Sequence, residues 1–171
     1  ADAIARTSKP ETFERLYSDL GSSNPDWNAM SSETSLLYPW NLGSTYIQKP
    51  PFFDEGIPAR TIQNARVLAI FGDSITTDHI SPVGSIPADS PAGRYLIDQG
   101  VERKDFNQYG ARRGNDRVMV RGTFANIRIK NRMVPSVEGG VTLHYPDGQP
   151  TTIFDAAMEY RREGIPMVII A

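Results

Sequence analysis

The fold is decided by the stretch Arg66-Val67-Leu68-Ala69-Ile70-Phe71-Gly72, a short apolar run that ends at a glycine. Its length and its branched and aromatic side chains predict a strand that is buried on both faces, as in parallel sheets. A second apolar run at residues 166–171 predicts another such strand. Between the two, Ser90-Pro91 suits the cap and first residue of a helix that ends before Gly100. Strands that alternate with helices indicate a mixed α/β domain.

The segment between that helix and the last strand predicts further elements. Residues 118–120, Val-Met-Val, favour a strand. Residues 141–145 and 151–154 favour the two strands of a hairpin, because the turn sequence Pro146-Asp147-Gly148 separates them. Residues 153–163 have apolar side chains at helical spacing and are followed by a glycine, which predicts a helix. Residues 73–89 are predicted to form a loop.

Residues 1–60 are predicted to be an N-terminal helix and interdomain linker, and residues 61–171 the packed domain. The sequence Ser8-Lys9-Pro10-Glu11 has capping-box spacing, and the apolar side chains after it predict one short helix that stops at Gly21. Residues 21–34 are polar and rich in turn formers. Four prolines disfavour regular helix over residues 35–60. We therefore expect a mostly irregular connector before the domain.

The composition of the 171 residues excludes several classes of protein. The chain has no cysteine, so it can form no disulfide framework, no thiolate nucleophile and no cysteine-ligated zinc or iron–sulfur site. The net charge of −2 predicts no general attraction to nucleic acid or acidic membranes. No apolar run approaches the ~20 residues that span a bilayer, and residues 1–30 lack a signal-peptide core. We therefore expect a cytoplasmic protein with no membrane contact.

The charge is unevenly distributed along the chain. Residues 101–132 contain nine basic and three acidic side chains, a local net charge of +6. Most of the nine are arginines, whose planar guanidinium can bind a carboxylate or phosphate through two hydrogen bonds. The segment therefore indicates an anionic ligand, although a solvated basic surface would have the same composition.

The loop after the first strand has the composition of a binding site. It reads Phe71-Gly72-Asp73-Ser74-Ile75-Thr76-Thr77-Asp78-His79-Ile80-Ser81-Pro82. Short side chains with oxygen atoms, placed beyond a strand end, can hydrogen-bond a small polar ligand. The alternative is a turn in which these side chains satisfy their own backbone.

Three kinds of chemistry fit this loop. A strand followed by Gly-Asp-Ser resembles the GDSL-type esterases, with Ser74 as nucleophile, but neither His79 nor His144 stands where such an enzyme needs its base. A metal site could use Asp73, Asp78 and His79, although adjacent Asp and His side chains rarely converge on one ion. In the third reading, Asp78 works as a carboxylate with groups from another segment.

The third reading is strengthened by a resemblance to the aconitase family. Its motifs cover most of the chain from about Leu37 to Ala171, and the matching stretches are residues 44–51, 72–86, 90–96, 106–116 and 121–128. The longest is Phe106-Asn107-Gln108-Tyr109-Gly110-Ala111-Arg112-Arg113-Gly114-Asn115-Asp116. The resemblance is to the branch that contains bacterial aconitase A and the iron regulatory proteins.

The resemblance implies a fold and a reaction. The fold would be the three-layer β/β/α swivel domain, similar to LeuD, incomplete at its C-terminus and preceded by a linker. In the whole enzyme this domain closes over a 4Fe–4S cluster, held by cysteines of the core domains, whose open iron polarises the substrate. The reaction converts citrate to isocitrate through cis-aconitate, a step of the tricarboxylic acid cycle. A serine in a Gly-Ser-Ser-Arg loop, expected directly after Ala171, would remove the carbon-bound proton.

The resemblance also assigns roles to residues of this chain. Asp78 falls on the catalytic aspartate, while Thr77 and Ser81 fall on neighbours that line the substrate site. Gln99 occupies a position where several family members carry a substrate-binding arginine, so its hydrogen bond to a carboxylate would lack the charge. His79 is interpreted as structural. The chain itself would bind no cofactor and would be inactive alone.

A second class of function that the resemblance implies is RNA binding. Iron regulatory proteins without their cluster bind an mRNA hairpin partly through this domain. The matching positions here are Ser81, Arg113 and Arg128, while Ser85 replaces an asparagine. The alternative is that these arginines bind substrate or stabilise contacts between domains.

Overall fold

The computed structural model describes residues 4, 7, 9–30, 35–52, 54, 56 and 61–171. The chain divides into two compact units, Ala1–Pro39 and Trp40–Ala171. None of the described helices is long and apolar enough to cross a membrane. The predicted division of the chain into a helix and linker at residues 1–60 and a swivel domain at residues 61–171 stays a prediction.

Over residues 9–30, the described part of the first unit holds two short helices, α2 (Pro10–Tyr17) and α3 (Pro25–Ala29), and each begins at a proline. The helix predicted before Gly21 is confirmed as α2, while the Ser8 cap lies outside the described residues. The prediction of one helix was wrong, because Asn24 caps α3 by accepting hydrogen bonds from two backbone amides. Neither helix buries a residue within this unit.

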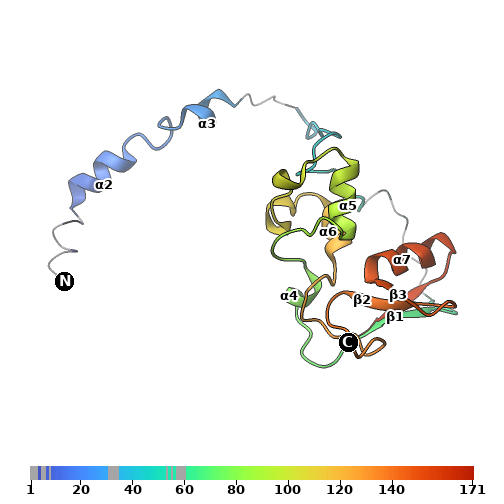
Figure 1. The fold of residues 1–171 in the computed structure, drawn as a ribbon. Helices are drawn as coiled ribbons and strands as arrows, with labels where there is room; N and C mark the ends of the chain where they lie inside the picture. Colours follow the sequence, from blue (N-terminus) through green and yellow to red (C-terminus); the bar gives the residue numbers. More distant parts are fainter. Residues whose placement is uncertain are drawn as a thin grey trace. The chain divides into compact units, whose positions relative to one another are not determined.

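The second unit contains two small sheets (Figure 1). Strand β1 (Arg66–Ile70) pairs in parallel with β4 (Met167–Ile170), and β2 (Val141–His144) pairs antiparallel with β3 (Gln149–Thr152). The sheets are joined by Thr142, whose Oγ1 donates a hydrogen bond to the Leu68 carbonyl at 2.5 Å. Helix α7 (Ile153–Arg162) packs against both sheets. The predicted strands at residues 66–71 and 166–171, the hairpin and the C-terminal helix are confirmed, and so is the mixed α/β class. The second hairpin strand is β3 and does not extend to residue 154, because α7 begins at Ile153. Strand β4 is not buried on both faces, since Ile169 and Ile170 are exposed.

Two hydrophobic clusters hold the second unit together. The first joins β1 to α7 and contains Leu68, Ala69, Phe71, Ile129, Ile153, Ala156 and Tyr160. The second joins α5 (Pro91–Asp98) to α6 (Asp116–Gly122) and contains Ile86, Ala92, Leu96, Phe106, Tyr109 and Val118. Two short 3-10 helices, η1 (Arg103–Asp105) and η2 (Tyr109–Arg112), connect α5 to α6. The predicted cap of α5 is confirmed, because the Ser90 hydroxyl accepts from the Gly93 amide at 3.1 Å.

Two sequence predictions were wrong in this unit. Residues 118–120 lie in α6 and not in a strand, because the Asn115 side chain accepts hydrogen bonds from the amides of Arg117 and Val118 and starts a helix there. Val118 is buried and Val120 is exposed, so α6 packs one face that includes Val118 against the domain and leaves Val120 in solvent. The predicted loop at residues 73–89 contains a four-residue helix, α4 (Thr77–Ile80).

Residues 44–48 dock onto the second cluster through Arg112, which is completely buried. Its Nε donates to the Phe106 carbonyl at 2.7 Å, and its Nη2 donates to the Asp105 carbonyl at 2.9 Å. Its Nη1 donates to the carbonyl of Thr45 at 2.8 Å and to the Thr45 hydroxyl at 3.0 Å. The guanidinium lies 4.0 Å from the ring centre of Tyr46. This part of the expected linker is therefore packed against the domain.

Candidate functional site

The candidate site is α4, which carries Asp78 and follows the carboxyl end of β1 (Figure 1). Parallel strands β1 and β4 end at the same edge of their sheet, which is where ligands bind in folds with parallel sheets. The chain turns out of β1 with Ser74 in the left-handed region, at a φ of 67°. Asp78 lies in the first turn of α4 with its side chain exposed. The carboxylate therefore remains open to a ligand.

His79 stabilises the start of α4. Its Nδ1 accepts a hydrogen bond from the Thr76 amide at 3.1 Å and lies 3.0 Å from the Thr76 hydroxyl. This is the reciprocal half of a capping box, which satisfies an amide at the helix start. The structural role expected for His79 agrees with this geometry.

Neither a serine hydrolase with Ser74 as nucleophile nor a metal site at Asp73, Asp78 and His79 is supported by this geometry. Nδ1 of His79 takes part in the helix cap, and His144 Nδ1 lies 3.0 Å from Asp147 Oδ1 at the β2–β3 turn. Among the hydrogen bonds of the described residues, none joins Ser74 to either histidine, as a base for a serine nucleophile would require. Within the part of the chain that the structure describes, no three His, Cys, Asp or Glu side chains gather as metal ligands.

A loop from a distant part of the sequence holds α4. Asn126 Nδ2 donates to the Asp78 carbonyl at 3.2 Å, and the Phe124 amide donates to the Ile80 carbonyl at 3.0 Å. The Asn126 Oδ1 accepts from the Arg128 amide at 2.8 Å. Sequence reasoning did not identify Asn126 as part of the site, because no local pattern links it to Asp78.

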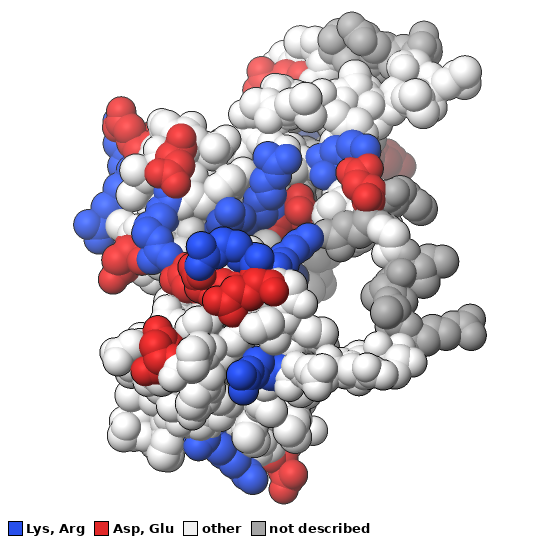
Figure 2. Space-filling view, turned by 90° about the vertical axis from the view of Figure 1, so that its right-hand side faces the viewer, with Lys and Arg blue, Asp and Glu red and all other residues white. Residues whose placement is uncertain are grey.

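The basic segment at residues 101–132 does not form one anion-binding surface. Arg112 is buried among carbonyl groups, whereas Lys104 and Lys130 pair with Glu102 at 2.7 Å and Glu138 at 2.8 Å. On the face drawn in Figure 2, lysine and arginine side chains are bordered directly by aspartate and glutamate side chains. Arg112, Lys104 and Lys130 are thus used within the fold or paired with acids, and the hypothesis of an anionic ligand stays a prediction for the other basic side chains of the segment.

One further arginine of this segment is used for packing. The Arg121 guanidinium lies 4.5 Å from the ring centre of Tyr95 and 5.0 Å from that of Phe154. Burial lowers the pKa of Arg121, and neighbouring charges partly offset the shift. Because Tyr95 belongs to α5 and Phe154 to α7, this contact connects the two hydrophobic clusters.

A cavity of about 750 Å³ lies between α5, the loop at residues 121–128 and the start of α7. Polar groups in its wall come from Ser85, Asn126 and Arg128. Tyr109 also lines it, with a hydroxyl that is buried and has no hydrogen-bond partner among the described residues. Burial raises the pKa of Tyr109, and the nearby Ser90 hydroxyl acts in the opposite direction.

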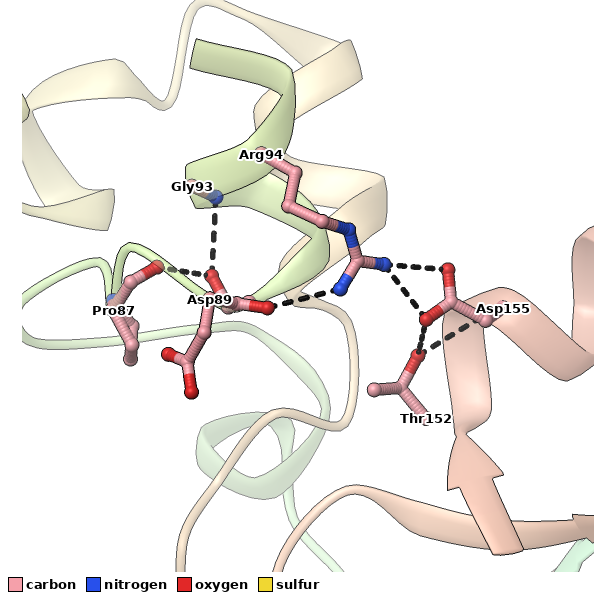
Figure 3. A network of polar contacts seen from close by, with 7 residues as sticks. Pro87, Asp89, Gly93, Arg94, Thr152 and Asp155 are labelled. Atoms are coloured by element: carbon pink, nitrogen blue, oxygen red, sulfur yellow. Dashed lines mark hydrogen bonds and ion pairs between the residues drawn. The ribbon is translucent and has the colours of Figure 1, made fainter. Parts of the chain in front are cut away.

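An ion pair joins Arg94 of α5 to Asp155 of α7 (Figure 3). Arg94 Nη2 lies 2.9 and 2.8 Å from the two carboxylate oxygens of Asp155, and Arg94 Nη1 donates to the Asp89 carbonyl at 2.9 Å. The Thr152 hydroxyl donates to Asp155 Oδ2 at 2.8 Å and accepts from the Asp155 amide at 3.0 Å. The network therefore fixes the start of α7 against α5.

The residues predicted for the site lie in four places. Thr77 and Ser81 lie on or next to α4, and the Ser81 amide donates to the Thr77 carbonyl at 2.8 Å. Gln99 caps the C-terminus of α5, about 12 Å of helix away from the N-terminus that lines the cavity. Arg128 lines the cavity, whereas Arg113 is exposed at the end of η2. The functional roles of all five residues stay predictions.

Comparison with known proteins identifies the family. Residues 92–171 match the family model described as the Aconitase C-terminal domain. The chain is 54% identical over 165 residues to aconitate hydratase A of Escherichia coli (strain K12), covering 94% of this chain and 18% of the relative. It is 54% identical over 175 residues to that of Pseudomonas aeruginosa, covering 100% of this chain and 19% of the relative. The corresponding protein of Deinococcus radiodurans is 50% identical over 174 residues, covering 99% of this chain and 19% of the relative.

The chain thus spans about a fifth of the length of these curated relatives. The similarity extends over residues 106–116, which contain the buried Arg112, and over residues 121–128, which contain the loop that holds α4. The resemblance seen in the sequence is therefore confirmed by a family model and by relatives that match nearly the whole chain. The chain belongs to the aconitase family.

Proposed function

We propose that this chain is the swivel-domain part of an aconitate hydratase that converts citrate to isocitrate through cis-aconitate. The observation that carries the proposal is the exposed Asp78 on α4, held at the carboxyl end of a parallel strand in a chain about half identical to aconitate hydratases. A carboxylate in this position can accept a hydrogen bond from a substrate hydroxyl and orient it. The substrates would be citrate, cis-aconitate and isocitrate.

The neighbouring side chains would contribute to binding of the substrate. Thr77 and Ser81 lie within one turn of Asp78 and carry hydroxyl groups that can donate to a substrate carboxylate. Gln99 would contribute an amide donor, which binds a carboxylate more weakly than an arginine does. Arg128 lines the cavity, and its backbone amide donates to Asn126 Oδ1. Its guanidinium would bind a substrate carboxylate.

The hydratase would use a 4Fe–4S cluster, which this chain does not ligate. The sequence contains no cysteine, and the described residues include no cluster of metal-ligating side chains. The cluster would therefore be held by core domains of the same protein, and it would act as a Lewis acid on the substrate. The contribution of this chain is confined to its own side chains. A cytoplasmic location is part of the same proposal.

RNA binding is not part of the proposed function. The relatives described above are named as hydratases, and the basic segment is divided by acidic partners and by the buried Arg112. A polyanion needs a continuous basic surface for strong binding.

The test is the substitution Asp78→Asn in a full-length hydratase that carries this chain, with matched Asp98→Asn as the control. Asp98 is an exposed carboxylate at the end of α5. Asp78→Asn should lower kcat for citrate by at least about 100-fold, the usual contribution of a positioned acid–base group. Asp98→Asn should leave kcat unchanged, and both variants should keep the visible absorbance of the cluster. An unchanged kcat in Asp78→Asn would show that Asp78 is not catalytic.

A second measurement tests the reaction itself. This chain can replace the matching residues of the Escherichia coli relative, to which it is 54% identical. The chimera should interconvert citrate and isocitrate. A chimera that folds and holds its cluster but has no activity would overturn the proposal that this chain belongs to a citrate-converting hydratase.

A further inference from the structure

Helix α4 does not determine its own position. It is a turn of four residues, and none of them is buried. Such a short helix is unstable alone, and its last carbonyl groups have no partner within the helix. Two of these carbonyls, those of Asp78 and Ile80, accept hydrogen bonds from Asn126 and from the Phe124 amide. The position of Asp78 therefore depends on a segment 48 residues further along the chain.

The orientation of the Asn126 amide is set by its second hydrogen bond. Its Oδ1 accepts from the Arg128 amide at 2.8 Å, so its Nδ2 is the atom that faces the Asp78 carbonyl at 3.2 Å. An aspartate at position 126 would keep the bond to Arg128, because that bond needs only an acceptor. It would lose the bond to α4 and place a negative charge next to the Asp78 carbonyl oxygen. Asn126→Asp thus keeps the side chain nearly equal in size and removes only the hydrogen bond to the Asp78 carbonyl.

The loop that carries Asn126 is held on both sides. Phe124 has a left-handed backbone with a φ of 61°, and its ring centre lies 5.1 Å from that of Phe71 in the first cluster. The Phe124 carbonyl lies 2.5 Å from where a Cβ on Gly140 would sit. At Gly122, a Cβ would lie 2.5 Å from the Tyr109 ring in the second cluster. These close contacts give α4 a fixed anchor between the two clusters.

We propose that Asn126 is a positioning residue, which fixes the Asp78 carboxylate in its catalytic place by binding the Asp78 backbone carbonyl. The inference rests on the proposed function of Asp78. Asn126 acts through Asp78, because its donor is used by that carbonyl and its acceptor by the Arg128 amide. Small displacements of a catalytic group reduce the rate strongly, so loss of this anchor lowers kcat more than it changes substrate binding.

The test uses Asn126→Asp in a full-length hydratase that carries this chain, measured per cluster-loaded enzyme. We expect kcat to fall about tenfold or more, and KM for citrate to change by less than about twofold. The matched control is Asn107→Asp. Asn107 is exposed and has a left-handed backbone. Its Oδ1 accepts from the neighbouring Gln108 amide at 2.9 Å, much as the Asn126 Oδ1 accepts from the Arg128 amide. This control introduces the same charge and should leave kcat unchanged.

A double-mutant cycle separates positioning from a general structural effect. If Asn126 acts through Asp78, Asn126→Asp causes no further loss of kcat in the Asp78→Asn background. Hydrogen exchange at residues 77–81 should become faster in Asn126→Asp, because α4 has lost its anchor. An equal loss of kcat in both backgrounds would overturn the proposal, because Asn126 would then act independently of Asp78.

The failure of this inference is distinct from the failure of the proposed function. A normal kcat in Asn126→Asp, together with a large loss in Asp78→Asn, would overturn only the role of Asn126. A normal kcat in Asp78→Asn would overturn the catalytic role of Asp78 on which this inference depends. Unchanged hydrogen exchange at residues 77–81 in Asn126→Asp would refute the anchor itself, whatever the activity.

Discussion

Replacing Arg112 by alanine should destabilise the fold far more than the loss of an ordinary surface charge. The side chain is fully buried and donates to the carbonyls of Thr45, Asp105 and Phe106, as well as to the Thr45 hydroxyl. Arg112→Ala removes all four hydrogen bonds and the contact with the Tyr46 ring. Of its hydrogen bonds to the described residues beyond position 100, the segment at residues 44–48 would then keep the one from Asn115 and the one between Gln48 and Gly114.

The size of the effect follows from the groups that lose a partner. The carbonyls of Asp105 and Phe106 each lose the donor shown for them, and a buried polar group without a partner costs about 1–3 kcal/mol. The Thr45 carbonyl keeps one donor, Asn115 Nδ2 at 2.9 Å, so its share is smaller. Removing the buried cation recovers part of its desolvation energy. We therefore expect a decrease of about 3–5 kcal/mol in the free energy of unfolding.

The assay is urea unfolding of the chain, followed by far-ultraviolet circular dichroism. Arg113→Ala is the matched control, because Arg113 is the next residue and is exposed, and its change should stay within about 0.5 kcal/mol. Residues 44–48 should also become sensitive to limited proteolysis in Arg112→Ala alone. A decrease below about 1 kcal/mol would refute the reasoning, since it would mean that the buried carbonyls find other partners.

Five further outcomes are expected, two of them for Tyr109. Tyr109→Phe should raise the free energy of unfolding at neutral pH by about 1–3 kcal/mol, because it removes a buried hydroxyl that has no partner among the described residues. Burial raises the pKa of Tyr109, so folding stability should fall as the pH rises above about 10, and this loss should be smaller in Tyr109→Phe in a pH series of urea unfolding. Gly122→Ala should lower the free energy of unfolding by about 2 kcal/mol or more, because its Cβ would lie 2.8 Å from Pro82 as well as against Tyr109, whereas Gly110→Ala meets nothing within 4 Å and serves as the control. The isolated chain should not convert cis-aconitate, and measurable turnover would contradict the assignment of the cluster to other domains. A filter-binding salt titration should show no preference for an mRNA hairpin over unrelated RNA, and sequence-dependent affinity with a steep salt slope would restore the RNA-binding hypothesis.

Elements with a strong local signal were predicted from the sequence. The run that became β1 is apolar after Arg66, the run that became β4 is apolar throughout, and Ser90-Pro91 caps α5 as expected. The turn at residues 146–148 separates β2 from β3, and Gly164 ends the α7 segment with a φ of 69°. In each case the signal and the structure it produces lie within a few residues of one another.

The errors occurred where the local signal was short. Three apolar residues at 118–120 show no periodicity that separates a strand from a helix. The deciding group was the Asn115 side chain, which satisfies two amides at the start of α6. Asn24 decided α3 in the same way. Both caps were present in the sequence and were not used in the prediction.

Asp78 could be selected from the sequence, because the loop composition and the family resemblance both point to residues 72–82. Asn126 could not, since its contact with Asp78 spans 48 residues and depends on the left-handed backbone of Phe124. The same limit applies to Arg112. The basic composition of residues 101–132 suggested that Arg112 binds an anion. Arg112 is instead buried against Thr45, where it makes a structural contact.

The sequence by itself determined the α/β class, the family, the absence of cysteine ligands and the loop that carries Asp78. These properties depend on residue type and on patterns within short windows. Only the tertiary structure decided which arginines are buried, and how α4 is held. The physical reason is that a buried guanidinium and a capped carbonyl acquire their partners through long-range packing, which no short window of sequence contains.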